Sequence, residues 1–215
     1  MKKLLPITIL LLASFQTTYT AENKLDMQLI FDRNTETLKN ALDQGADVDY
    51  VVASGLYKGT TPIYEAVQCY IESSKSFSDD DASEISFAIT EALLDQGLSN
   101  TINHACPDAY TRNFKKISPL GMAIWHYCSH PFFDEDNSED TRYLQAKTLI
   151  KELIRHGADI NEISCQKVFE LLPQQFNPRM PQFTLEKIQA RMAKVRAMYN
   201  EHKPKKSMLK LDFAD

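Results

Sequence analysis

The phrase LKNALDQGADVD occupies residues 38–49, and variants of it return as ITEALLDQGLSN at residues 89–100 and LIKELIRHGADIN at residues 149–161. In each copy the apolar residues are spaced three or four positions apart, which gives a helix one apolar face. Each pattern stops at a glycine, and the three glycines are Gly45, Gly97 and Gly157. Glycine takes the left-handed conformation of a helix C-terminus at little cost. The repetition predicts a chain built from recurring helical units.

A second phrase precedes two of these helices. It reads TTPIYEAV at residues 60–67 and ISPLGMAI at residues 117–124. In both copies a hydroxyl residue, Thr61 or Ser118, can cap a helix, and the proline that follows suits the first helical position. Each unit is therefore expected to pair one helix that starts at a capped proline with a second helix that ends at glycine.

Taken together, the Thr-Pro-Leu-like start, the Gly-Ala-Asp ending and the Asn or Asp turn after it resemble the ankyrin repeat over roughly residues 25–175. The resemblance implies an all-α, ankyrin-type helical-repeat solenoid with a C-terminal capping helix. Ankyrin repeats recur about every 33 residues, whereas the glycines here are 52 and 60 residues apart. We therefore expect expanded loops, with an insertion between the two helices of each unit at residues 73–84 and 129–140.

The first residues indicate export. Lys2 and Lys3 precede an apolar run and a short polar stretch, which is the layout of a signal peptide. The run is about half the length that a membrane-spanning helix needs. We expect a periplasmic or secreted protein without a stable membrane anchor. The expected divisions are a signal peptide at 1–21, about three to four divergent repeats at 22–176, a capping helix at 184–202 and a flexible tail at 203–215.

The charge of the chain and its motifs limit the classes of function that it can have. Without the two leader lysines, the chain has 22 basic and 29 acidic residues, and its net charge changes from −5 to −7. This balance argues against a nucleic-acid partner. The sequence contains none of the familiar nucleotide-binding, hydrolase or metalloprotease phrases. We therefore expect a protein that is not an enzyme and that uses no cofactor or metal.

Four cysteines remain after the leader: Cys69, Cys106, Cys128 and Cys165. An even number in an exported chain is compatible with disulfides, and three pairings can be drawn. Equivalent positions in adjacent repeats lie next to each other. This favours one disulfide between Cys69 and Cys128 and another between Cys106 and Cys165. Buried free thiols are the alternative.

Two local patterns invite a metal interpretation. His126 and His130 are four residues apart, as metal ligands on one helix face can be, but they also end an apolar helix with packing residues around them. The acidic stretch from Asp134 begins like a calcium loop. It has Glu139 where the turn needs glycine and Gln145 where a bidentate Glu should close the site. Core packing and a solvated loop are the preferred interpretations.

The family resemblance implies a partner-binding surface made from the first helices and the loops between repeats. The residues expected to face outward there are Tyr57, Lys58, Tyr64, Gln68, Tyr110, Arg112, Asn113, Phe114, Trp125 and His126. The two insertions would add an acidic rim that suits a basic partner. Its residues are Asp79, Asp80, Asp81, Asp134, Glu135 and Asp136.

The last helix carries Lys187, Arg191, Lys194 and Arg196, which we expect on the side opposite its apolar face. A basic amphipathic helix can lie on a membrane, although a solvated face of a capping helix is the commoner case.

What is known of the ankyrin family implies that this chain works by binding another protein. One role is an immunity or inhibitor protein that masks a toxin, whose basic surface would meet the acidic rim. The alternatives are a periplasmic stress or assembly factor and a secreted effector, with an enzyme as the least favoured.

Overall fold

The computed structural model describes residues 21–204 except 56, 75–79, 99, 107–115, 131–140 and 176–183. Regular secondary structure in this part of the chain is helical, so the predicted all-α class is confirmed. The helices are α2 (Ala21–Phe31), α3 (Thr35–Asp43), α4 (Pro62–Ser73), α5 (Asp80–Asp95), α6 (Pro119–Ser129), α7 (Thr141–Arg155), α8 (Ile163–Leu171) and α9 (Leu185–His202), with a 3₁₀ turn η1 (Leu172–Gln175) after α8. Residues 1–20 of the expected leader (1–21) and residues 205–215 of the expected tail (203–215) lie outside the described residues.

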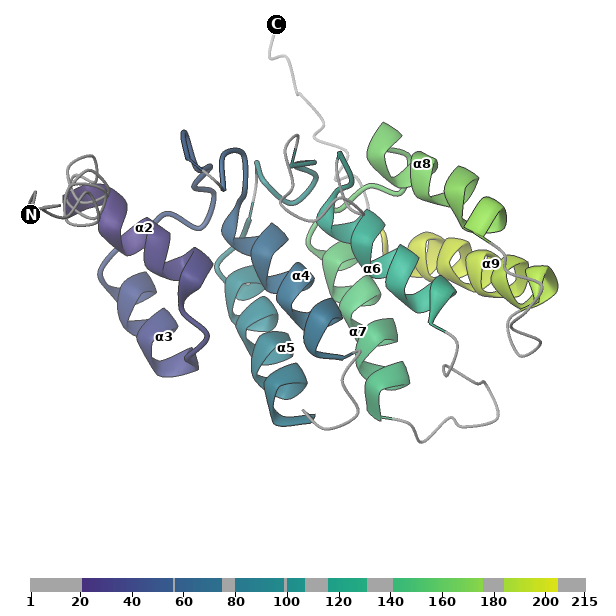
Figure 1. Ribbon diagram of the computed structural model, residues 1–215, viewed down its shortest axis with the longest axis horizontal. Helices are drawn as coiled ribbons and strands as arrows, with labels where there is room; N and C mark the ends of the chain where they lie inside the picture. The colour runs from purple at the N-terminus through teal and green to yellow at the C-terminus, as the bar shows by residue number, and fades with distance from the viewer. Residues whose placement is uncertain are drawn as a thin grey trace, which may run out of the picture.

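The helices pack in two rows (Figure 1). Helices α2, α4, α6 and α8 contact one another in this order, and α3, α5, α7 and α9 form a second row in the same way. Contacts between α2 and α3, α4 and α5, and α6 and α7 join the rows into helical pairs. Helix α9 also contacts α6, so it covers the last pair of this repeat-like stack.

The capping phrases act as predicted. Thr61 Oγ1 accepts a hydrogen bond from the Tyr64 N–H at 3.2 Å, and Pro62 opens α4. Ser118 Oγ accepts from the Gly121 N–H at 3.2 Å at the start of α6. These bonds satisfy donors that a helix N-terminus would otherwise leave unpaired. The glycines that end α3, α5 and α7 have φ of +87°, +81° and +99°, as their position predicted.

Hydrogen bonds between successive turns hold the stack together along one edge. Thr101 Oγ1 donates to Asp49 Oδ1 at 2.7 Å, and the Asp159 N–H donates to Asn103 Oδ1 at 2.8 Å. At the far end the Tyr199 hydroxyl donates to Asp159 Oδ1 at 2.7 Å. Asp49 and Asp159 follow two of the helix-ending glycines, so the repeated phrase supplies both a helix stop and a link to the next layer.

The first insertion is shorter than expected. Helix α5 begins at Asp80, so residues 80–84 of the expected insertion at 73–84 are helical and that boundary was wrong. The physical reason is packing at the start of α5. Ser83 is buried, and its hydroxyl donates to Gln145 Oε1 on α7 at 3.5 Å. The second insertion separates the end of α6 from Thr141, where α7 begins.

Helix α9 differs from the expected basic amphipathic helix at Arg191. This side chain is 2% exposed, and the expectation that it faces solvent was wrong. Its Nη1 donates to the Tyr127, Cys128 and His130 carbonyls at 3.4, 3.3 and 2.8 Å. These carbonyls end α6 and need donors, because a helix leaves its last acceptors without partners.

The neighbouring Arg196 guanidinium stacks on the Phe169 ring of α8, 4.5 Å from its centroid. The basic residues of α9 therefore serve in part to hold the helix on the stack. Among the helices of the described residues, none combines the length and the apolar character that crossing a bilayer requires.

Candidate partner-binding surface

In the loop between α3 and α4, residues 51–55 and 57–60 form a hairpin, which we call the finger hairpin. Two backbone bonds close it: the Val52 N–H donates to the Thr60 carbonyl at 3.0 Å, and the Gly59 N–H donates to the Val52 carbonyl at 2.8 Å. Gly55 and Gly59 have φ of +84° and +82°, a conformation that glycine adopts more easily than other residues. The glycines of this loop thus permit its tight turn.

The next inter-repeat loop anchors the finger hairpin. His104 Nε2 donates to the Gly59 carbonyl at 2.9 Å, and Cys106 Sγ lies 3.7 Å from Thr60 Oγ1. Because both contacts come from a loop that follows α5, the hairpin is braced on the neighbouring layer of the stack. A braced loop loses little conformational entropy when it binds a partner.

An aromatic pair marks the exposed side of this region. Phe31, the last residue of α2, lies against Tyr57 of the finger hairpin with ring centroids 4.6 Å apart in an edge-to-face arrangement. Phe31 is 44% exposed and Val51 is 39% exposed, while Tyr57 is half-buried and Lys58 exposed. Solvent-accessible aromatic side chains beside a braced loop are typical of residues that carry binding energy.

Three residues expected on the binding surface are interior instead. Tyr64, Gln68 and His126 are buried, with exposures of 1%, 7% and 2%, so the expectation that they face outward was wrong. The reason is that α4 and α6 each contact first-row helices on both sides as well as their own second helix. Trp125 is half-buried against the core. The loop residues Tyr110, Arg112, Asn113 and Phe114 lie outside the described residues.

The acidic rim falls mostly outside the described residues, which exclude Asp79, Asp134, Glu135 and Asp136 as well as the side chain of Asp80. Asp81 is exposed on the first turn of α5.

The residues that border the two insertions lie together. Ser74 Oγ, after α4, shares a hydrogen bond of 3.0 Å with His126 Nε2 on α6. The Tyr70 hydroxyl donates to the Arg142 carbonyl at the start of α7 at 3.4 Å.

The predicted disulfides do not form, and all four cysteines are buried free thiols. Cys69 is eight residues after its helix cap, whereas Cys128 is ten residues after its own, so the two are not at equivalent positions. Cys106 and Cys165 lie in different layers. Cys106 contacts Thr60, and Cys165 Sγ lies 3.2 Å from Ser118 Oγ.

Burial keeps three of these thiols protonated at neutral pH. It raises the pKa of Cys69 to about 12, with a further contribution from the Glu65 carboxylate beside it. It also raises the pKa of Cys128 to about 12 and that of Cys165 to about 11. Because the thiolate is the nucleophilic form, these three side chains are poor nucleophiles.

The two histidines form a packing pair. Their rings are 5.1 Å apart and nearly perpendicular, and the His126 ring also packs against Tyr70. No group of three His, Cys, Asp or Glu side chains suited to a metal ion occurs among the residues that the structure describes. The calcium-like stretch from Asp134 lies outside them.

Two features of the surface were not foreseen from the sequence. Phe31 ends a helix whose apolar pattern is weak, so the only available signal was its aromatic type. The second is a cavity between the turn after α7 and the end of α9, which no local sequence motif predicts. Comparison of the chain with protein-family models, with curated proteins and with solved structures returned no match in any of the three.

Proposed function

We propose that this chain is an exported, ankyrin-type repeat protein that acts by binding a protein partner and not by catalysis. The observation that carries the proposal is the braced finger hairpin with the Phe31–Tyr57 pair, of which Phe31 is exposed. Loops that project from such a stack are the parts that repeat proteins offer to partners. The ankyrin assignment is supported by the capped Thr-Pro and Ser-Pro starts and by the left-handed glycines after the second helices.

The charge of the chain favours a basic partner. The sequence around the two insertions is acidic, and the residues that border them, such as Ser74 and His126, lie together. Opposite charges would steer a basic surface toward this edge of the stack, at the ends of α4 and α6, and speed its association. A toxin with a basic surface fits this description, and the chain would then be its immunity protein.

The test is affinity capture from the native cell envelope with three forms of the protein. The first is the wild type and the second carries Phe31→Ala and Tyr57→Ala. The third, a matched control, carries Leu144→Ala, because Leu144 on α7 is also 44% exposed. We expect one partner that the wild type and the control retain and that the double variant loses. Equal recovery by all three forms would refute the role of the hairpin.

The immunity role has its own test. It requires a toxin gene beside the gene for this chain, and the two purified products should form a one-to-one complex on size exclusion. The association rate should fall steeply as salt is raised, because steering between exposed charges is screened. A pull-down with the neighbouring gene product that recovers nothing would rule this role out while leaving the hairpin test intact.

A further inference from the structure

A cavity of about 680 Å³ lies at the C-terminal end of the stack, away from the finger hairpin. Its lining residues come from two segments, 157–159 and 161 in the turn after α7, and 199–201, 203 and 204 at the end of α9. Its volume is within the range of sites that hold small organic ligands, roughly 300–1,000 Å³. We call it the end pocket.

Asp159 is held in place within the end pocket. Its Oδ1 accepts hydrogen bonds from the Asn161 N–H at 2.9 Å, from Asn161 Nδ2 at 2.8 Å and from the Tyr199 hydroxyl at 2.7 Å. Three donors on one oxygen fix the direction of the carboxylate. A ligand would therefore meet a preorganised negative group and not a mobile one.

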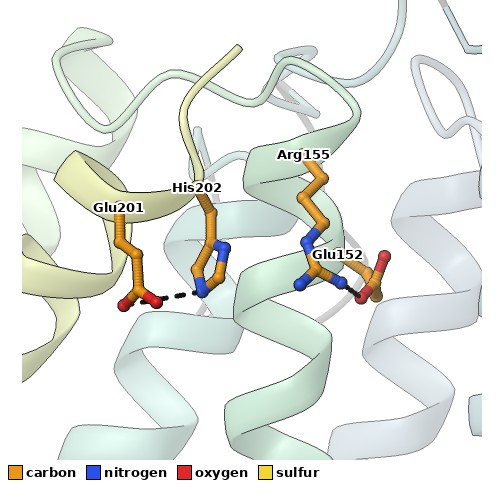
Figure 2. A network of polar contacts seen from close by, with 4 residues as sticks. All are labelled: Glu152, Arg155, Glu201 and His202. Carbon is orange, nitrogen blue, oxygen red and sulfur yellow. Dashed lines mark hydrogen bonds and ion pairs between the residues drawn. The ribbon is translucent and has the colours of Figure 1, made fainter.

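Besides Asp159, the described lining of the end pocket has one charge of each sign, and two helix ends beside it add negative charge. Glu201 lines the pocket and Lys203 is the one cation in its described lining. Helices α7 and α9 both end there, and the C-terminus of a helix carries about half a negative charge. Arg155, the last residue of α7, is engaged by Glu152, and Glu201 lies beside His202 on α9 (Figure 2). The balance therefore favours a cation in the pocket.

The chain itself shows that an ammonium group fits this environment. Lys203 Nζ lies over the Tyr199 ring, 5.8 Å from its centroid. The face of a tyrosine ring attracts cations, and the attraction increases as water is excluded. Tyr199 thus offers a ring face for a cation while its hydroxyl is bonded to Asp159.

We propose that the end pocket binds an alkylammonium group through Asp159, Glu201 and the Tyr199 ring. The group can come from a small diamine or from a lysine side chain, since both present the same chemistry. This site is independent of the finger hairpin, and its test needs no protein partner.

The experiment is a titration of the isotope-labelled full chain, followed by NMR, with 1,4-diaminobutane as the first probe. The second probe is a short peptide with one lysine, and the control is 1,4-butanediol, which has the same length without charge. We expect saturable shifts confined to residues 157–161 and 199–204 with the diamine and none with the diol. Saturation by the diamine alone would assign a free amine, and tighter binding of the peptide would assign a lysine side chain.

Variants separate binding from folding. Glu201→Gln removes a charge from a side chain that is 71% exposed, so the fold should survive. Together with Asp159→Asn it should weaken the binding of the diamine at least about tenfold, and Lys203→Gln should strengthen it by removing the internal competitor. Equal affinity of all forms, equal binding of the diol, or no saturable shift with either amine would overturn the proposal.

Discussion

Helices α4 and α6 begin with the same phrase and can be compared residue by residue from their caps, Thr61 and Ser118. Tyr70 and Tyr127 then occupy the same position, and both are fully buried. Both also reach the first turn of α7. The Tyr70 hydroxyl donates to a backbone carbonyl there, and the Tyr127 hydroxyl shares a hydrogen bond of 3.2 Å with that of Tyr143. The tyrosine that α4 and α6 have in common thus holds each helix against α7 in the second row.

The two helices differ where they meet other neighbours. Tyr64 of α4 aligns with Gly121 of α6, and Glu65 aligns with Met122. A Cβ at Gly121 would lie 2.6 Å from Ile117 Cγ2, so α6 has no room for the side chain that α4 buries there. A common phrase thus determines how a helix starts, whereas the neighbouring helices determine the size of side chain that each position accommodates.

The helix ends differ as well. The hydroxyls of Ser73 and Ser74 donate to the last carbonyls of α4 at 2.9 to 3.0 Å, so this helix is capped by its own sequence. The corresponding carbonyls of α6 depend on Arg191, more than sixty residues away. Helix α6 therefore needs α9, and α4 does not.

The largest effect should come from Tyr64→Ala. The side chain is fully buried, and removing a buried aromatic ring leaves a cavity that costs about 3–5 kcal/mol. The free energy of unfolding from urea denaturation measures this loss. Tyr57→Ala, on the half-buried hairpin side chain, is the matched control and should cost less than about 1 kcal/mol. Similar losses in the two variants would show that Tyr64 is not an interior residue.

Arg191→Met should have the next largest effect. Methionine retains much of the side-chain volume, but three carbonyl groups lose their shared cationic donor, at a cost of about 2–3 kcal/mol. Gln189→Ala on the exposed face of α9 serves as control. Hydrogen exchange should become faster at the end of α6 and in α9 but stay unchanged at the end of α4. Equal acceleration at both helix ends would break the contrast between them.

The sequence predicted the parts of the fold that local chemistry determines. Caps such as Thr61 and Ser118 and stops such as Gly157 depend on residues within one turn, and all three act as expected. The burial of Arg191 could not be predicted, because the sequence of one helix gives no sign that its basic side faces the end of another helix. The burial of Tyr64 and His126 could not be predicted for the same reason, since neighbouring helices cover them.

Less of the candidate site than of the fold could be predicted from the sequence. Tyr57 and Lys58 stand out as polar and aromatic residues before a capped helix, but Phe31 joins them only through tertiary packing. The end pocket combines a turn and a helix end that are about 40 residues apart in the chain, and no periodicity connects them.

Gly121→Ala should destabilise the protein by about 1–2 kcal/mol, although alanine is the better helix former. The added methyl group would contact Ile117, and Val168 of α8 lies 3.4 Å from the same point. A double-mutant cycle with Ile117→Ala tests the cause, because the cost of Gly121→Ala should fall once the Ile117 side chain is removed. A cost that is the same in both backgrounds would place the strain elsewhere.

The smallest effect is expected from Glu65→Gln, at the position where α6 has the buried Met122. Burial raises the pKa of the Glu65 carboxyl above its usual 4.5, and Glu72 raises it further, while the Cys69 hydrogen bond and Arg33 lower it. The folded state therefore binds this proton more tightly than the unfolded state does. The contribution of Glu65 to stability is complete below pH 4.5 and is lost as the pH rises through the folded-state pKa.

Glutamine has no charge to bury and keeps an oxygen for the Cys69 thiol, so Glu65→Gln should raise the free energy of unfolding at pH 7. The gain should shrink toward zero at pH 4, where the wild-type carboxyl is protonated in the folded state. Urea denaturation at the two pH values measures the difference, with Glu170→Gln on the exposed face of α8 as control. A loss of stability at pH 7 would mean that Arg33 and Cys69 outweigh burial, and that α4 tolerates a charge at the position where α6 accommodates a buried methionine.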